Sequence, residues 1–497
     1  MLSKATFKKH SLLMVAGCLV PLGLAPYDIW VIALLCLTFL YQQITTHKSE
    51  KIISLVVTFN LGAFLSGTSW VFVSINKYGF VPVPFALVAT FIFCLFLAFL
   101  NSVPFIIWSR IPQNRVSSVL AFSSLWVLGE WLRSWFLTGF PWLLVGYSQS
   151  STWLSGWATI GGVFWVSFIS ALIAACIWEI YLIRSKPNEV MLSFTLILFL
   201  AITGANLLHM NWTKQSGDIL KVALIQPNID QLQKWSLDSR NRILNQLSAQ
   251  SSQYWDHDLI VWPEAAIPVI PQNANLFLSK IGRRARESST TLITGIPTYN
   301  PSTQRYHNSA LALGEKTGQY NKTKLVPFGE YVPMDNLLRG LIRFFDLPMS
   351  NFSRGKKHQD LLSAHGHKIA SAICYEVVYP DLVADNAIGA SLILTISNDA
   401  WFGDSLALPQ HLQMAQMRSI ELSKPIIRAT NNGLSAIIDH KGRITSQLDP
   451  FISTELSGSI RPMSGQTPFA KFGSIPCIAF CSIVVMFLVF LKLRENF

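Results

Sequence analysis

Ser371-Ala372-Ile373-Cys374-Tyr375-Glu376 is the end of an apolar run of strand length, closed by a thiol and then by a carboxylate. Among the seven cysteines of the chain, Cys374 is the one outside a long apolar stretch. The other six are Cys18, Cys36, Cys94, Cys176, Cys477 and Cys481. Structural cysteines of oxidising compartments normally come in pairs, so an isolated thiol there indicates chemistry. The alternative is a buried core cysteine, which is a common environment for a free thiol.

The composition of the chain is that of a membrane protein. Of its 497 residues, 51% are hydrophobic and only 13% are charged, whereas soluble proteins carry about 25% charged residues. Most of its long apolar stretches approach or exceed the ~20 residues with which a helix crosses a bilayer. They are 11–26, 29–45, 52–75, 84–108, 117–137, 161–183, 190–208 and 474–492. We therefore expect a polytopic membrane protein.

Between about residues 212 and 465 the composition changes: charged residues are more frequent and the apolar runs are shorter. About 250 residues suffice for one large soluble domain. We expect a seven-helix transmembrane region over 1–211, a soluble catalytic domain over 212–465 and a C-terminal transmembrane helix within 466–497.

The soluble domain alternates short β-rich runs with amphipathic stretches, which predicts a layered α/β fold. Strands are expected near 220–226, 258–262, 291–296, 309–313, 367–374, 391–397, 426–430 and 434–439. Helices are expected near 238–254, 273–288, 379–388 and 410–422.

Lysine and arginine are concentrated in alternate loops between the apolar stretches, which predicts the orientation of the chain. They are Lys4, Lys8, Lys9, Lys48, Lys51, Arg110, Arg115, Arg184, Lys186, Lys492 and Arg494. If these loops are cytoplasmic, seven crossings place the soluble domain outside the cytoplasm. The net charge of +12 then follows largely from topology and requires no nucleic acid.

Three candidate chemical groups stand at predicted strand ends. Glu264 ends Val261-Trp262-Pro263-Glu264, Lys322 lies in the loop 320–330, and Cys374 follows the strand 367–374. Taken singly, Glu264 reads better as a helix N-terminal residue after Pro263, and Lys322 as part of a solvated basic loop. Taken together, they supply a nucleophile, a carboxylate base and a cation for an oxyanion. That set is sufficient for acyl transfer without histidine.

The same residues resemble a known superfamily. Trp262-Pro263-Glu264, Lys322 with 325–330, and Cys374-Tyr375-Glu376 resemble the Glu-Lys-Cys triad of the nitrilases. The resemblance to the apolipoprotein N-acyltransferases covers essentially the whole chain. It is carried by Ala25-Pro26-Tyr27-Asp28-Ile29-Trp30, Gly139-Phe140-Pro141-Trp142, Gly146-Tyr147-Ser148-Gln149, Asn398-Asp399-Ala400-Trp401-Phe402-Gly403 and Thr430-Asn431-Asn432-Gly433.

The resemblance implies a multi-pass α-helical membrane domain and an αββα sandwich on the outer face of a bacterial inner membrane. It implies that Glu264 is the general base, Lys322 the oxyanion stabiliser and Cys374 the nucleophile. Further residues match the family pattern. Glu330 would position Lys322 or assist proton transfer, and Tyr375 and Glu376 follow the cysteine directly. Trp235 lies on a loop near the mouth of the site, and Trp401 and Phe402 are further candidates for substrate binding.

The implied reaction is ping-pong transfer. Cys374 would take the sn-1 acyl chain of a membrane phospholipid as a thioester, and the α-amine of a diacylglyceryl-cysteine at an apolipoprotein N-terminus would then accept that chain. No cofactor and no metal are implied, and we expect a monomer integral to the membrane. His358, His365 and His367 hint at a metal only weakly, since zinc needs three or four convergent ligands.

A segment over 333–349 has apolar residues at helical spacing, among them Leu341 and Phe345. We interpret it as an interfacial arm that gates entry of the acyl chain. An ordinary helix facing the core explains the spacing equally well.

Two other functions fit part of the sequence. A membrane-tethered amidase or nitrilase acting on a small soluble substrate shares the triad, but it does not explain seven apolar stretches. A transporter with an external accessory domain would carry paired ionisable residues inside several helices. Only Glu130, Arg133 and Glu179 come close to that pattern.

Overall fold

The computed structural model describes residues 4–46, 52–331 and 352–495. The chain forms two compact units, each described here by itself. Unit 1 comprises Met1–Phe72, Pro82–Met210 and Lys471–Phe497, and unit 2 comprises Val73–Val81 and Asn211–Ala470. The first segment of unit 2, Val73–Val81, therefore lies within the part of the sequence, 1–211, that was predicted to be the membrane region.

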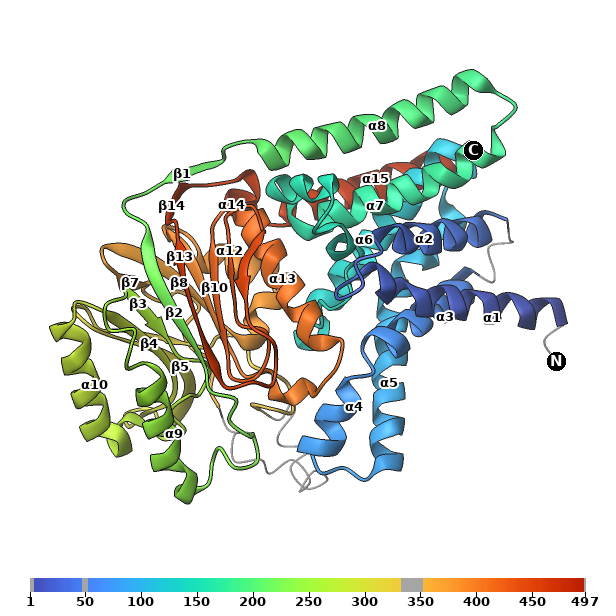
Figure 1. Cartoon of the computed structure of the whole chain (residues 1–497). Coiled ribbons are helices and arrows are strands. Elements are labelled where there is room, and N and C mark those ends of the chain that lie inside the picture. The colour runs from blue at the N-terminus through green and yellow to red at the C-terminus, as the bar shows by residue number, and fades with distance from the viewer. Residues whose placement is uncertain (1–3, 47–51, 332–351, 496–497) are drawn as a thin grey trace. The chain divides into compact units, whose positions relative to one another are not determined.

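Unit 1 is helical (Figure 1). Its main helices are α1 Lys4–Leu19, α2 Trp30–Thr45, α3 Ile52–Gly67, α5 Val83–Ser102, α6 Arg115–Trp135, α7 Ala158–Leu182, α8 Pro187–His209 and α15 Ile475–Glu495. In the described part of the chain, four helical segments are long and apolar enough to cross a membrane, namely Val83–Arg110, Trp153–Leu182, Pro187–His209 and Ile475–Glu495. The prediction of a multi-pass α-helical membrane region is confirmed.

The predicted stretch 52–75 is not one straight helix. Helix α3 ends at Gly67, and the chain resumes as α4 (Val71–Val73) and a helical turn over Ser74–Tyr78, bent by 58° from α3. The small polar residue Thr68 ends the helix, where its hydroxyl donates to the carbonyl of Phe64 at 2.7 Å. The two parts could form one broken span by length and composition.

Two mixed six-stranded sheets form the middle of unit 2. The first has the order β13-β2-β3-β4-β5-β6 and the second β12-β11-β10-β9-β8-β7. The strands of the first are β13 Thr454–Ile460, β2 Leu220–Gln226, β3 Leu259–Val261, β4 Thr291–Asn300, β5 Arg305–Leu313 and β6 Gly318–Asn321. Those of the second are β12 Ile444–Gln447, β11 Ala436–Ile438, β10 Ile426–Thr430, β9 Leu392–Ser397, β8 His367–Ile373 and β7 Leu362–Ala364. A small pair, β1 Thr213–Gln215 and β14 Met463–Gly465, is separate.

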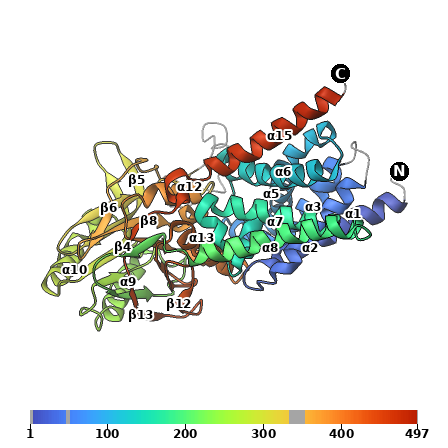
Figure 2. The same cartoon turned by 90° about the horizontal axis from the view of Figure 1, so that it is seen from above.

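Alternating side chains of the first sheet define the layers. Val222 and Leu224 of β2 pack in a core shared with strands of the second sheet, whereas Ala223 and Ile225 pack with residues of α9 (Leu237–Gln250). This is the period of two expected of a strand buried on both faces. Helices α9 and α10 (Asn275–Glu287) cover the first sheet, and α12 (Pro380–Asn386) and α13 (Ala407–Leu422) lie beside the second (Figures 1 and 2). The predicted αββα sandwich is confirmed.

Strand direction gathers the predicted site residues at one edge. β2, β3 and β4 are mutually parallel, and two antiparallel steps from β4 through β5 make β6 run the same way. In the second sheet β8, β9 and β10 are also parallel. Reactive groups of α/β folds are commonly found on loops at the carboxyl ends of parallel strands, and the candidate residues follow β3, β6 and β8.

Candidate active site

Glu264, Lys322 and Cys374 converge inside unit 2. Glu264 lies three residues after β3, and Lys322 and Cys374 directly follow β6 and β8. All three side chains are buried, with exposed fractions of 7%, 1% and 8%. The thiol of Cys374 interacts electrostatically with both the Glu264 carboxylate and the Lys322 ammonium.

The ammonium of Lys322 lies between two carboxylates. Its Nζ is 3.2 Å from Oε1 of Glu264 and 3.0 Å from Oε1 of Glu330. Burial alone would lower the pKa of Lys322, but the charges of Glu264 and Glu330 outweigh it and hold that pKa well above its usual value. Lys322 therefore stays charged at neutral pH, and it can stabilise an anion but cannot act as the base.

Asn308, in the middle of β5, joins the same two carboxylates from a second direction. Its Nδ2 donates to Oε1 of Glu264 at 2.7 Å and to Oε1 of Glu330 at 2.8 Å. Sequence reasoning missed this residue. The available signal was a polar residue inside a strand that is otherwise suited to burial, Asn308 followed by Ser309-Ala310-Leu311.

The turn that carries Glu264 is held by the backbone around it. Ala265 has a positive φ of 46°, and the amide of Gly295 donates to the carbonyl of Pro263 at 3.1 Å. The buried Lys234 donates to the main-chain oxygen of Glu264 at 3.1 Å, and the amide of Asn398 donates to its Oε2 at 2.8 Å. The carboxylate is thus fixed in orientation while its negative charge faces the site.

Cys374 occupies a strained backbone position at the end of β8. Its φ is 51°, in the left-handed region that costs a residue other than glycine about 1–3 kcal/mol. The buried carboxylate of Glu376 stabilises the turn by accepting from the amide of Ile373 at 2.8 Å. It also accepts from the amides of Thr323 and Lys324, at 2.6 and 3.0 Å. Glu376 therefore ties the turn of the cysteine to the loop of Lys322.

A fully buried polar cluster supports Cys374 from behind. Nε2 of His411 lies 3.3 Å from the carbonyl oxygen of Cys374, and Nδ1 lies 3.0 Å from a guanidinium nitrogen of Arg428. The carbonyl oxygen of Cys374 can only accept, so Nε2–H is the donor of that bond, and Nδ1 also lies 3.2 Å from Oδ1 of Asp399. Burial and the Arg428 charge lower the pKa of His411.

Asp399 balances the charge of that cluster. Its carboxylate is 2.7 Å from Arg428 and accepts from the hydroxyl of Ser397 at 2.5 Å. Burial alone would raise the pKa of Asp399, but Arg428 and His411 hold it below its usual range. Gly433 is required beside it, because a Cβ there would lie 2.2 Å from Asp399 Oδ2.

The electrostatics of the triad define what it can do. Burial, reinforced by the charge of Glu264 and opposed by Lys322, raises the pKa of Cys374 above its usual value. The resting thiol is therefore protonated and becomes nucleophilic only when a base takes its proton. Lys322 is excluded as that base. The candidate acceptors of the thiol proton are therefore the two carboxylates that contact Lys322, those of Glu264 and Glu330.

The remaining predicted residues surround this centre or lie outside the described residues. Trp235 follows Lys234 and is half-buried, and Tyr375 packs edge-on against Tyr379 with ring centroids 5.3 Å apart. Phe402 is buried and meets the ring of His411 at 5.6 Å. Leu341, Phe345 and the expected helix over 333–349 fall in 332–351, outside the described residues.

Trp401 contacts the segment of unit 2 that comes from the predicted membrane region. The hydroxyl of Ser74 donates to the carbonyl of Trp401 at 2.7 Å, and the rings of Tyr78 and Trp401 pack edge to face at 5.3 Å. The Asn398–Gly403 loop is therefore fixed both to Glu264 and to Val73–Val81.

Comparison with known proteins gives the same division of the chain. Residues 16–176 match the apolipoprotein N-acyltransferase N-terminal domain, and residues 221–467 match the carbon-nitrogen hydrolase family. Among solved structures, Nit3 of Saccharomyces cerevisiae, a member of branch 10 of the nitrilase superfamily, is 17% identical, covers 54% of this chain and 97% of its own, and has a TM-score of 0.39.

Full-length relatives are far more similar in sequence. The apolipoprotein N-acyltransferase of Azotobacter vinelandii is 43% identical over 479 residues, which are 94% of this chain and 92% of that protein. The apolipoprotein N-acyltransferase of Pseudomonas aeruginosa (strain LESB58) is 42% identical over 493 residues, which are 98% of this chain and 96% of that protein. The chain belongs to the apolipoprotein N-acyltransferase family.

Proposed function

We propose that this protein acylates the α-amine of the diacylglyceryl-cysteine at the N-terminus of apolipoproteins, with a membrane phospholipid as the acyl donor. The observation that carries the proposal is the buried contact of Lys322 with Glu264, in a site where Cys374 interacts electrostatically with both. Membership in the family supplies the substrate class.

In the first half-reaction Cys374 is the nucleophile. Glu264 takes the thiol proton as Sγ attacks the carbonyl carbon of the donor ester, and the oxyanion develops close to the Lys322 ammonium. The C–O bond to the glycerol breaks, and Glu264 returns the proton to the departing oxygen. The products are a thioester on Cys374 and a lysophospholipid.

In the second half-reaction the acceptor amine attacks the thioester. Glu264 takes a proton from the attacking amine, the C–S bond breaks, and the proton passes to the departing sulfur. Glu330 and Asn308 act as positioning residues, because Glu330 holds Lys322 and Asn308 holds both Glu264 and Glu330. Exclusion of water from the thioester favours transfer over hydrolysis.

The proposed location is a bacterial inner membrane with unit 2 on the periplasmic side. The support is the concentration of Lys and Arg in alternate loops of the sequence, together with the apolar helices of unit 1. Both substrates are lipids, so an enzyme integral to the membrane meets them where they reside.

The direct test uses the full-length protein in phospholipid-containing micelles. A phospholipid labelled in its sn-1 acyl chain is incubated with a synthetic diacylglyceryl-cysteine peptide, and the peptide is analysed for an N-linked labelled chain. Labelled triacyl peptide is expected from the wild type and not from Cys374→Ala. Absence of the labelled product, with ammonia released from small amides instead, would establish the amidase alternative.

A further inference from the structure

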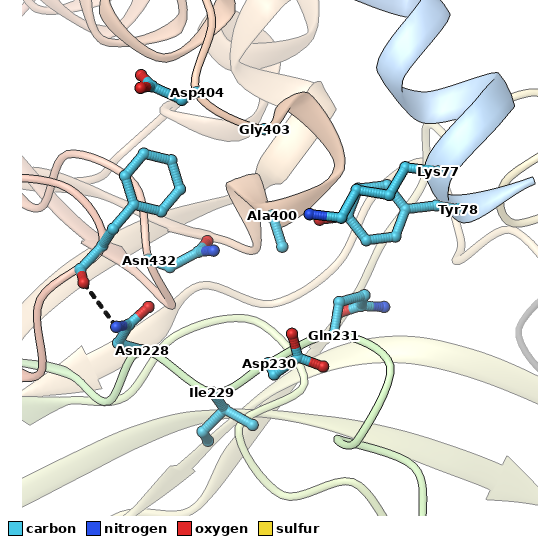
Figure 3. A pocket seen from close by; sticks show the side chains of 11 residues that line it. Lys77, Tyr78, Asn228, Ile229, Asp230, Gln231, Ala400, Gly403, Asp404 and Asn432 are labelled. Atoms are coloured by element: carbon cyan, nitrogen blue, oxygen red, sulfur yellow. Dashed lines mark hydrogen bonds between the residues drawn. The ribbon is translucent and has the colours of Figure 1, made fainter.

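Unit 2 contains a pocket of about 410 Å³ that is separate from the residues of the triad (Figure 3). Its walls are loops that follow β2, β9 and β10, together with Lys77 and Tyr78 of the Val73–Val81 segment. The carboxyl ends of parallel strands are where α/β folds commonly bind ligands. None of the residues assigned to the triad lines this pocket.

The pocket is preformed, because its loops are bonded to one another. The amide of Asn228 donates to the carbonyl of Asn431 at 2.8 Å, and Nδ2 of Asn228 donates to the carbonyl of Phe451 at 2.7 Å (Figure 3). The Asn431 side chain forms two further hydrogen bonds with the main chain of Ile229. Its Oδ1 accepts from the amide at 3.0 Å, and its Nδ2 donates to the carbonyl at 2.8 Å. A ligand therefore meets a fixed set of polar groups.

One of those groups is an unused acceptor. Asn432 is only 9% exposed and lines the pocket, and its Oδ1 has no hydrogen-bond partner in the described part of the chain. A buried acceptor without a partner is unfavourable, so such a group indicates a ligand that brings a donor. An N–H group in the pocket would satisfy it.

The charged side chains that line the pocket favour some classes of ligand over others. Lys77 projects an ammonium from one wall, and the Asp230 carboxylate and the Gln231 amide project toward the same space (Figure 3). Asp404 also lines the pocket, so the lining carries one cation and two carboxylates, which disfavours a phosphate group. A peptide main chain presents both N–H and C=O groups and matches this mixture of acceptors and donors.

The pocket is linked to the general base through one residue. Nδ2 of Asn398 donates to Oε1 of Gln231 at 2.5 Å, and its amide donates to Glu264 Oε2 at 2.8 Å. Ala400, two residues further along the chain, lines the pocket, and two residues span at most about 7 Å. An acceptor whose α-amine reaches Glu264 would bring its next residues into the pocket.

Building on the proposed function, we propose that this pocket binds the main chain of the first residues after the acylated cysteine of the acceptor. Main-chain recognition would allow many different proteins to be served by one site, because it does not read side chains. Asn432 accepts a peptide N–H, and Lys77 donates to a peptide carbonyl. Oδ1 of Asp230 already accepts from the amides of Leu232 and Gln233, so its Oδ2 accepts the second peptide N–H.

The test compares two acceptors on full-length protein: a diacylglyceryl-cysteine pentapeptide and diacylglyceryl-cysteine amide, which lacks the peptide. The variants are Asp230→Asn and Asn432→Leu, and the matched control is Asp218→Asn, an exposed aspartate outside the pocket. We expect KM for the pentapeptide to rise about tenfold in both variants, equivalent to about 1.4 kcal/mol. KM for the amide should stay within twofold of wild type, and the control should match wild type with both acceptors.

Two further measurements separate the possible outcomes. Asn432→Leu should unfold at or above the temperature of wild type, since it removes an unpaired buried acceptor, and this distinguishes lost binding from lost folding. An unchanged KM for the pentapeptide, or equal losses with both acceptors, overturns the peptide site. A loss confined to thioester formation from phospholipid overturns it too, in favour of a donor headgroup. A wild-type protein that forms no thioester refutes the proposed function instead.

Discussion

Nζ of Lys322 lies 3.2 Å from Oε1 of Glu264 in a site where the lysine is 1% exposed. The raised pKa of Lys322 keeps its ammonium charged, so the lysine can stabilise an oxyanion but cannot serve as the base. Lys322→Met should slow thioester formation by about 10²–10³, the loss typical when one stabilising donor for an oxyanion is removed.

The matched control for that change is Lys324→Met. Lys324 lies two residues along the same loop, with its ammonium 4.5 Å from the ring centroid of Tyr379. Its variant should form the thioester within a few-fold of wild type. Equal losses in the two variants would mean that general damage to the loop, and not the charge at Lys322, explains the effect.

His411 should position the nucleophile through its bond to the Cys374 carbonyl. His411→Leu removes the donor to the Cys374 carbonyl and the ring that contacts Arg428 and Asp399, so we expect thioester formation to slow by at least tenfold. His411→Gln keeps an N–H donor and should recover much of the rate. The rate of a single turnover from phospholipid measures both, and a glutamine variant no better than the leucine variant would count against this role.

Gly295 should be intolerant of a side chain because of the turn that carries Glu264. A Cβ at residue 295 would lie 2.4 Å from the amide nitrogen of Ala265 and 2.5 Å from the Pro263 carbonyl oxygen. Gly295→Ala should therefore displace Glu264 and abolish most acyl transfer. Gly282→Ala is the control, since its Cβ would meet nothing closer than 3.8 Å; full activity of both variants would show that the turn can shift without consequence.

Lys234 should make the stability of the protein depend on alkaline pH. Burial lowers the pKa of Lys234 from 10.5 to about 8, despite the opposing charge of Glu264. Between about pH 8 and 10.5 the unfolded chain then binds more protons than the folded one, so stability rises with pH across this window. The full change is roughly 3 kcal/mol, at 1.36 kcal/mol per pKa unit.

The measurement is the thermal unfolding midpoint at a series of pH values. Lys234→Met should be the more stable protein near pH 7 and should show a flatter rise above pH 8. Lys424, whose pKa burial also lowers to about 8, remains in both proteins and accounts for the slope that is left. The same slope in wild type and Lys234→Met would show that Lys234 is not neutral in the folded state at high pH.

The sequence predicted the strands whose apolar pattern is strong, and it failed where the pattern is weak. β2, β9 and β10 were expected close to their observed bounds, whereas β13 was missed because Thr454–Ile460 is largely polar and only partly buried. The bend after Gly67 was missed because an apolar stretch alone does not reveal where a helix breaks. The packing of residues 73–81 with the rest of unit 2 is a long-range effect that local sequence does not encode.

In the candidate site, too, residues with a recognisable local sequence context could be predicted, and residues that act through distant partners could not. Glu264, Lys322 and Cys374 follow strands and carry recognisable neighbours, so their sequence context predicted them. Asn308 and His411 act through partners distant in the chain, on β5 and on α13, and no local motif marks them. Such positioning residues become visible only when the hydrogen bonds of the folded protein are known.

A thioester on Cys374 would be detected directly in the intact mass of the full-length protein after incubation with phospholipid and no acceptor. The wild type should gain the mass of one acyl chain, which neutral hydroxylamine should remove, whereas Cys374→Ala should gain none. A wild-type protein that stays unmodified, or a hydroxylamine-sensitive chain that persists in Cys374→Ala, would contradict a thioester on Cys374.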